Sequence, residues 1–295
     1  MSTDIRDRPT IGHDEVLGLN FINPAAPYVF RKHFRQGLRS HIMEILDPRD
    51  VETERNGTIS ADGIRRFPMA RPRRMLRIFR SRLHTIEDAL KEIGRVRTVE
   101  RYLAPDFMAT SVECIVDYQR PQGRDLLLCG FQEYVIGSIV DPWTILDQSD
   151  LLPELYDGAT GSADGDAPPR KRWIRTVQQN GAEFVTRIKR MLVEAATIPD
   201  LAGAGNLIAT ASGEFRLVDI NNISSVDFDG SIPLDEKGYP VCDKSIEALA
   251  LIEKKIAGQP IDKQNGLYKN FFDPTRWKAV KAKESAFWSR IENTV

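Results

Sequence analysis

Residues 199–224 read PDLAGAGNLIATASGEFRLVDINNIS, and this stretch decides the fold that we expect. The apolar runs NLIA at 206–209 and FRLV at 215–218 are joined by the turn-forming segment TASGE, a pattern that predicts a small β-hairpin. Asn206 stands at the start of this hairpin, and Asp219 follows its end. Since a hairpin brings its two ends to the same edge, one amide and one carboxylate are expected side by side.

Helices are expected on both sides of this stretch, because apolar residues recur there at helical spacing. They cover residues 172–197, 244–257 and 275–292, and a short helical stretch is expected to begin at Asp141. Residues 157–171 are rich in Gly, Asp, Ala and Pro, which favours a mobile loop.

The first half of the chain predicts one further helix at its start and a group of strands. Residues 28–46 carry an apolar stripe at near-helical spacing with basic residues beside it, which predicts a basic amphipathic helix; the stripe consists of Phe30, Phe34, Leu38, Ile42 and Ile45. Packing on its own domain is the expected role of this helix, and lying on an anionic membrane is the alternative. Residues 56–80 predict strands, with Asp62-Gly63 as a hairpin turn.

The clearest helix is expected over residues 85–103. Thr85 is a good N-cap with Asp88 three positions later, as in a capping box. Two further strands are expected over residues 111–118 and 125–135, joined by a turn-rich segment.

The resulting order is a β-rich segment, one helix, two strands, a linker, a long helix, a small hairpin and further helices. This order resembles the protein-kinase-like superfamily, in its atypical or aminoglycoside-phosphotransferase-like branch, over roughly residues 56–257. The resemblance implies an α+β, two-lobed fold with a small antiparallel β-rich N-lobe that contains one helix and a mainly helical C-lobe. It divides the chain into an N-terminal arm with the amphipathic helix at 1–50, an N-lobe at 51–135 and a C-lobe at 136–295.

The resemblance also assigns site residues in the quoted stretch. In that family an Asn and an Asp on either side of a small hairpin hold Mg²⁺ on the phosphates of ATP, which makes Asn206 and Asp219 the expected metal ligands. Their oxygen atoms are the hard donors that Mg²⁺ prefers. Asp200 resembles the catalytic aspartate that orients the acceptor hydroxyl, although it precedes Asn206 by six positions where the family has five. The alternative is that Asn206 and Asp219 are ordinary turn residues and that Asp200 caps a loop.

Nucleotide-binding residues are implied in the first half of the chain. Arg77 occupies the place of the family's strand lysine, and Glu92 on the next helix occupies the place of the glutamate that pairs with it. The alternative is a surface arginine and an exposed glutamate. Residues 131–135 would form the hinge between the lobes, with Glu133 and Val135 as the expected contacts to adenine.

Three functions stay open from the sequence. The first is an ATP- and Mg²⁺-dependent phosphotransferase whose acceptor is unknown, and the second is a catalytically inactive pseudokinase that acts as a nucleotide-binding or regulatory module. The third is binding of RNA or another polyanion through residues 64–82, where eight arginines are interleaved with Phe67 and Phe79.

Composition limits the remaining classes of protein. The 295 residues have a formal net charge of −1, so the whole chain has no general attraction to nucleic acid or membranes. Three widely spaced cysteines argue against a disulfide framework, and together with the absence of a membrane-spanning apolar run they favour a cytoplasmic protein. GxSxG, HExxH and P-loop motifs are absent, which removes the common hydrolase and NTPase interpretations.

Overall fold

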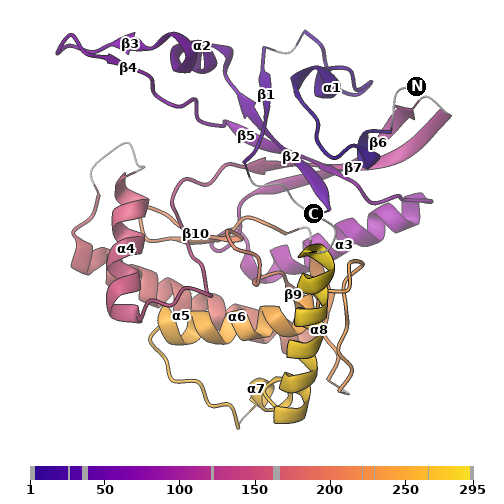
Figure 1. The fold of residues 1–295 in the computed structure, drawn as a ribbon, viewed down its shortest axis with the longest axis vertical. Helices are drawn as coiled ribbons and strands as arrows, with labels where there is room; N and C mark the ends of the chain where they lie inside the picture. Colours follow the sequence, from indigo (N-terminus) through magenta and orange to yellow (C-terminus); the bar gives the residue numbers. More distant parts are fainter. Residues whose placement is uncertain are drawn as a thin grey trace. The chain divides into compact units, whose positions relative to one another are not determined.

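The computed structural model describes residues 4–25, 27–34, 39–120, 123–161, 167–220, 222–228, 230–264 and 266–292. It confirms the α+β class, with an antiparallel sheet and several helices (Figure 1). The chain forms two compact units, each made of two segments. Unit 1 comprises Met1–Gly94 and Thr110–Tyr134, and unit 2 comprises Arg95–Ala109 and Val135–Val295.

Unit 1 is built on a five-stranded antiparallel sheet with the order β1-β2-β5-β7-β6. Its strands are β1 (Val29–Lys32), β2 (Ser40–Leu46), β5 (Arg74–Phe79), β6 (Ser111–Arg120) and β7 (Gly123–Glu133). Successive side chains point to opposite faces of a sheet, so Leu76 and Ile78 join one apolar cluster while Phe79 joins another. Both faces of the sheet therefore bury apolar side chains.

Different segments cover the two faces. The N-terminal arm, with the 3₁₀ helix η1 (Ile5–Asp7) and α1 (His13–Leu17), packs on the face of Leu76. The beginning of α3 (Ile86–Leu103) packs on the face of Phe79 through Ala89 and Ile93. α3 begins as the sequence predicts, because the backbone N–H of Asp88 donates to the hydroxyl of Thr85 at 3.0 Å while the N–H of Thr85 donates to the carboxylate of Asp88 at 3.1 Å.

The helix predicted over residues 28–46 is wrong, because β1 and β2 occupy this segment. The buried side chains of β2 on the arm's side of the sheet are Met43 and Ile45, which alternate as a strand requires. Of the supposed helical stripe, Phe34 is 77% exposed and Leu38 lies outside the described residues. The coincidence of a few apolar residues at helical spacing misled the prediction.

A helix that the sequence analysis missed follows β2. α2 (Pro48–Asn56) begins after Asp47, whose carboxylate accepts the N–H of Arg49 at 2.9 Å. It ends at Gly57, where φ is 71°, a conformation that favours glycine. The hairpin of β3 (Thr58–Ile59) and β4 (Arg65–Arg66) comes next, with the predicted Asp62-Gly63 turn between its strands.

Unit 2 is mainly helical. Its elements are the second half of α3, β8 (Ser138–Ile139), α4 (Gln148–Gly161), α5 (Arg170–Ala195), β9 (Thr197–Pro199), β10 (Leu207–Ala209), β11 (Phe215–Leu217), β12 (Ile223–Ser225), α6 (Val241–Lys255), α7 (Gly266–Phe271) and α8 (Pro274–Glu292). Its core includes Trp173 and Phe184 of α5, Phe215 of β11 and Leu249 of α6. The close packing of α5 on α6 requires Gly181, because a methyl group there would lie 2.8 Å from Cγ2 of Ile256.

In unit 2 the structure confirms the predicted helices, as α5, α6 and α8, and the predicted hairpin of β10 and β11. Two other segments differ from their predictions. Residues 157–161 belong to α4 and residues 170–171 to α5, so the mobile loop predicted at 157–171 is wrong at both ends, and residues 162–166 lie outside the described residues. Asp141 begins a turn rather than a helix, because α4 starts only at Gln148.

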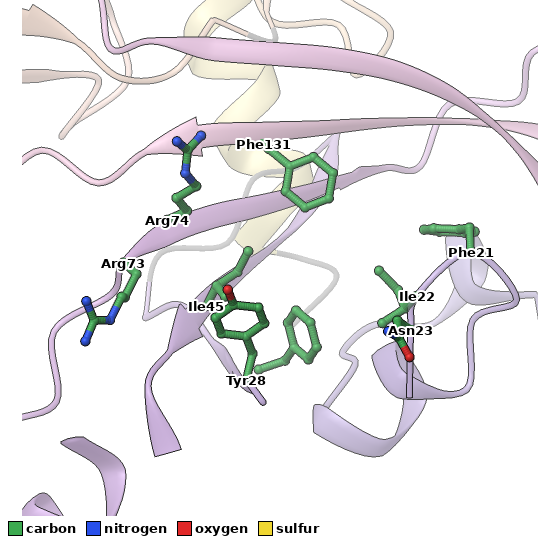
Figure 2. Close-up of a pocket in the computed structure, with 9 residues that line it drawn as sticks. Phe21, Ile22, Asn23, Tyr28, Ile45, Arg73, Arg74 and Phe131 are labelled. Atoms are coloured by element: carbon green, nitrogen blue, oxygen red, sulfur yellow. The ribbon is translucent and has the colours of Figure 1, made fainter. Parts of the chain in front are cut away.

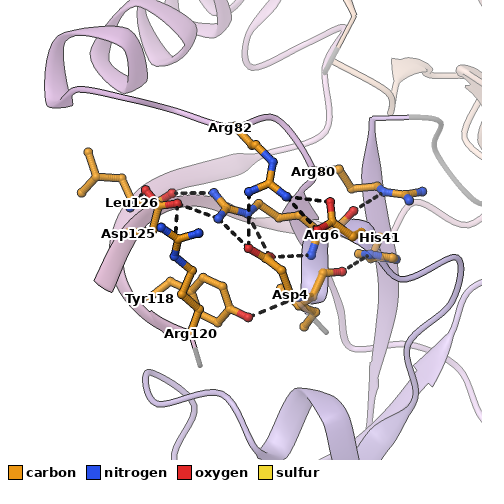
Figure 3. Close-up of polar contacts among 11 residues, drawn as sticks. Asp4, Arg6, His41, Arg80, Arg82, Tyr118, Arg120, Asp125 and Leu126 are labelled. Carbon is orange, nitrogen blue, oxygen red and sulfur yellow. Dashed lines mark hydrogen bonds and ion pairs between the residues drawn. The ribbon is translucent and has the colours of Figure 1, made fainter. Parts of the chain in front are cut away.

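A buried ionic network fastens the N-terminal arm to the sheet of unit 1 (Figure 3). The guanidinium of Arg6 is fully buried and contacts the carboxylate of Asp4 at 2.7 Å and that of Asp125 at 2.6 Å. One residue earlier, the N–H of Ile5 donates to the hydroxyl of Tyr118 at 3.2 Å. These contacts join the start of the chain to strands that come more than a hundred residues later.

Replacing Arg6 by alanine should lower the free energy of unfolding by about 3 kcal/mol, because two carboxylates would lose their shared buried partner. Urea unfolding measures this change. Arg8→Ala is the control, since Arg8 forms its ion pair with Glu15 at an exposed position and such pairs contribute little. Equal stability of the two variants would contradict a structural role for the network.

Candidate functional site

The candidate site in unit 2 starts at the end of β9. After α5, Ala196 adopts a left-handed conformation with φ of 45° and reverses the chain into β9, which pairs with β12. The N–H of Asp200 then donates to the carbonyl of Asn222 at 2.8 Å. The two-stranded pairing therefore places Asp200 directly beside the residue that precedes β12.

The carboxylate of Asp200 has a fixed orientation. Its Oδ1 accepts the N–H groups of Ala202 at 2.9 Å and Gly203 at 3.1 Å, and its Oδ2 accepts a bond from the side-chain amide of Asn222 at 3.2 Å. The first two bonds are those of a loop cap, which was the alternative reading of this residue. Asn222 was not singled out in the sequence, although an amide three positions after Asp219 was a signal that could have been followed.

Asn206 is buried, and a hydrogen bond fixes the orientation of its side-chain amide. Its Nδ2 donates to the backbone carbonyl of Asp200 at 2.8 Å, and its own carbonyl accepts the N–H of Val218 at 2.8 Å. Since the amide nitrogen points to Asp200, the amide oxygen points away from it, and no hydrogen bond to that oxygen is found among the described residues. Gly203 makes room for this arrangement, because a methyl group there would lie 2.5 Å from Nδ2 of Asn206.

Asp219 follows β11, which pairs antiparallel with β10 in the predicted hairpin. Burial is the main cause that raises the pKa of Asp200 to about 6, and the charge of Asp219 adds to it. The three hydrogen bonds to Asp200 act in the opposite direction. Asp219 is therefore close enough to repel the Asp200 carboxylate, and the three predicted residues Asp200, Asn206 and Asp219 lie near one another.

The segment before α6 adds a tyrosine that the sequence analysis missed. The hydroxyl of Tyr239 donates to Glu284 of α8 at 3.3 Å. Burial raises the pKa of Tyr239, and the charges of Glu284 and Asp200 contribute to this shift. Tyr239 therefore lies within electrostatic range of the same aspartate.

The donor atoms of this cluster suit a magnesium ion that is also bound by phosphates. The described residues contain no group of three or more His, Cys, Asp or Glu side chains that could hold a metal. Mg²⁺ commonly takes only one or two carboxylates from the protein and completes its shell with water and phosphate oxygens. Two aspartates and one asparagine within the same short stretch provide oxygen donors of that kind.

In unit 1 the structure gives Arg77 a partner that was not predicted. Nη2 of Arg77 contacts Oε1 of Glu113 on β6 at 2.8 Å and the hydroxyl of Ser111 at 2.9 Å. The side chains of Arg77 and Glu113 are only 3% and 5% exposed. Glu92, the partner expected from the family resemblance, lies half-buried on α3, and its pairing with Arg77 stays a prediction.

The ion pair spans three strands because the middle strand carries no side chain at the crossing point. Gly130 of β7 is opposite both Arg77 and Glu113 in the sheet. A methyl group at Gly130 would lie 3.3 Å from Nε and Nη2 of Arg77 and 3.3 Å from Oε1 of Glu113. Gly130 thus lets a long guanidinium cross β7 to reach Glu113.

The two expected adenine contacts lie at the end of the sheet. Glu133 is exposed at the end of β7, where its carboxylate accepts the N–H of Thr110 at 3.1 Å. Val135 is half-buried, and the border between the two units falls just before it. Their roles in nucleotide binding stay predictions.

Comparisons with known proteins add no assignment. No family model matches the chain, and a search of curated proteins finds no match either.

Among the described helices, none combines the length and apolar character needed to cross a bilayer. The three cysteines are free.

Replacing Asp219 by asparagine should lower the pKa of Asp200 below 6, because the nearby negative charge is removed while burial persists. NMR titration of the Asp200 side-chain carbon measures the pKa directly. Asp150→Asn, which removes an exposed carboxylate from α4, should leave it unchanged. An unaltered pKa in Asp219→Asn would show that the two carboxylates are not close.

The raised pKa also has a consequence for stability. The folded state holds the proton of Asp200 above the ordinary pKa of 3.8, so ionisation of Asp200 lowers stability as the pH rises from about 4 to about 6, and the loss persists at higher pH. The difference in unfolding free energy between Asp200→Asn and the native chain should therefore shift in favour of the variant by about 2 kcal/mol from pH 4 to pH 7. Urea unfolding at the two pH values measures this shift, and a pH-independent difference would contradict it.

Replacing Gly130 by valine should destabilise the protein by about 3 kcal/mol, because the side chain would push Arg77 away and leave Glu113 buried without its ion pair. Thermal or urea unfolding tests the effect. Gly94→Ala is the control, since a methyl group at this position of α3 would meet no atom within 4 Å. A tolerated valine at position 130 would contradict the crossing geometry.

Proposed function

We propose that the chain is an ATP- and Mg²⁺-dependent phosphotransferase of the kinase-like class with an atypical active site. The observation that carries this proposal is the cluster in unit 2. Asp219 lies close enough to Asp200 to raise its pKa, and the amide of Asn206 is held against the Asp200 carbonyl with its oxygen turned away. The order of elements along the chain, which resembles that family, supports the same class.

Each residue of the cluster has a distinct role in this proposal. Asp219 and Asn206 would hold the metal through their oxygens, and the ion would supply positive charge against the phosphates of ATP. Asp200 orients the acceptor hydroxyl and takes its proton as the oxygen attacks the γ-phosphorus and the bond to ADP breaks. A carboxylate with a pKa near 6 is largely ionised at pH 7 and still basic enough for this step.

Positioning and charge stabilisation would supply most of the rate enhancement, as in phosphoryl transfer generally. The hydrogen bonds from Ala202, Gly203 and Asn222 hold the Asp200 carboxylate in one orientation before substrate arrives. Such preorganisation avoids an entropic cost at the moment of reaction. The chemical nature of the acceptor is left open by this cluster.

A second candidate function is a nucleotide-binding or regulatory module without turnover. The observation that favours it is the burial of Arg77 in its ion pair with Glu113, since the family uses a lysine at the corresponding place. A guanidinium held at 3% exposure would need to leave that pair before it could contact a phosphate.

The observations give less support to polyanion binding through residues 64–82. Arg77 and Phe79 are buried, and Arg82 forms an ion pair with Asp7 at 2.7 Å. Phe67 is 60% exposed and is therefore accessible for stacking on a base.

The test measures ATP turnover and Mg-ATP binding by the same protein. We expect slow ATP hydrolysis or transfer that Asp219→Ala reduces on the order of 100-fold, because a group that stabilises transition-state charge is lost. Mg-ATP at about 100 times its dissociation constant should also stabilise the native chain by about 2.7 kcal/mol, and EDTA should remove most of this gain. Asp150→Ala, which removes an exposed carboxylate of the same unit, is the matched control.

The outcomes separate the candidates. Binding without turnover supports the regulatory module and contradicts the enzyme. Absence of both binding and turnover contradicts both, and equal turnover in Asp219→Ala contradicts the assignment of the metal site.

A further inference from the structure

A pocket of about 540 Å³ lies within unit 1, on the face of the sheet that the N-terminal arm covers (Figure 2). Its floor comes from three strands, with Phe30 of β1, Ile45 of β2 and Phe131 of β7. The volume is in the range of about 300–1,000 Å³ that small-molecule sites occupy. The lining is mostly apolar, as such sites require.

The pocket exists because the arm covers only part of this face. Ile5, Ile11 and Val16 bury the central strands, but the arm then turns, and Phe21 and Ile22 form a side wall instead of a cover. Tyr28, which is 45% exposed, adds an aromatic ring.

Apolar surface also continues past the floor of the pocket. Val112 of β6 is directly opposite Phe131 in the sheet, on the same face, and is 59% exposed. The uncovered surface is therefore larger than isolated exposed side chains would produce.

This face is separate from the one that carries the Arg77 ion pair. Along β5 the side chains of Arg74 and Leu76 share one face, and Arg77 and Phe79 belong to the other. The pocket therefore does not use Arg77, Gly130 or any other residue of the candidate site.

One end of the pocket is basic. Figure 2 shows Arg73 and Arg74 together at one end and Phe21, Ile22 and Asn23 at the other. Arg73 contacts the carboxylate of Asp47 at 2.9 Å. For Arg74, no hydrogen bond or ion pair of the guanidinium is found among the described residues, although β5 pairs it with Glu133.

Glu133 leaves the basic end available to an anion. Its carboxylate is bound to the N–H of Thr110, and it does not line the pocket. An anion that enters the pocket would meet the guanidinium of Arg74 directly, and a guanidinium can hold both oxygens of a carboxylate.

We propose that this pocket binds a planar aromatic carboxylate. The rings of Tyr28, Phe30 and Phe131 would contact the flat apolar body of the ligand. Contacts between aromatic rings contribute more binding free energy than the burial of their apolar area alone. The carboxylate would bind Arg74, with Arg73 adding positive charge nearby. This site is independent of the phosphotransferase proposal.

The test compares two probes with the same ring system, 2-naphthoate and its uncharged analogue 2-naphthamide. Calorimetry on the full chain should show that 2-naphthoate binds about fivefold more tightly, which corresponds to about 1 kcal/mol for a partly exposed charge pair. In Arg74→Gln this preference should disappear while 2-naphthamide binding stays the same. Tyr28→Ser should weaken both probes, and because Tyr28 is 45% exposed this change leaves the fold intact.

Arg55→Gln is the matched control, since it removes an exposed arginine of α2 that does not line the pocket. It should keep the preference for 2-naphthoate. Equal affinity for the two probes in the native chain, a preference that survives in Arg74→Gln, or no binding of 2-naphthoate at millimolar concentration would each overturn the proposal.

Discussion

The pairing of short strands that holds two aspartates close together is the constraint on which the candidate site of unit 2 depends. Asp200 is fixed by the pairing of β9 with β12, and Asp219 is fixed by the hairpin of β10 and β11. Neither residue can move away without breaking a set of backbone hydrogen bonds, so the unfavourable interaction persists in the folded state. Proteins retain such arrangements mostly where a charge must be bound or a proton moved.

The buried ion pair of unit 1 is likewise held in place by strand pairing. A guanidinium and a carboxylate inside a sheet are costly to desolvate, and close contact with additional hydrogen bonds offsets this cost. Ser111 supplies such a bond to Arg77, and Gly130 supplies the space in which the pair forms. Three strands therefore have to be in register before the pair can exist, which ties the position of Arg77 to the register of the sheet.

Much of the fold could be predicted from local patterns in the sequence. The capping box at Thr85, the Asp62-Gly63 turn and the hairpin between Asn206 and Asp219 were predictable because each depends on residues close together in the chain. The strands within residues 28–46 were not, since their pairing with β5 is settled by tertiary contacts that override local spacing.

The residues of the candidate site also fall into two groups, those that the sequence could predict and those that it could not. Asp200, Asn206 and Asp219 lie within one short stretch, and a motif could therefore find them. Glu113 and Asn222 could not be assigned so directly. Glu113 meets Arg77 across a sheet from 36 positions away, and nothing in the local sequence of either residue specifies the other. Asn222 contacts Asp200 only because two short strands pair.

The attachment of the N-terminal arm has a consequence for how the protein is made. The arm leaves the ribosome before the strands that bind it, because the groups that contact Ile5 and Arg6 lie on β6 and at Asp125 of β7. Until those strands emerge, the sheet that the arm covers is incomplete, and nascent chains with such exposed apolar segments are prone to aggregate. Contacts of such long sequence separation also slow folding. Unit 1 therefore cannot mature as its early residues appear, and its assembly must wait until the chain has been synthesised past Glu133.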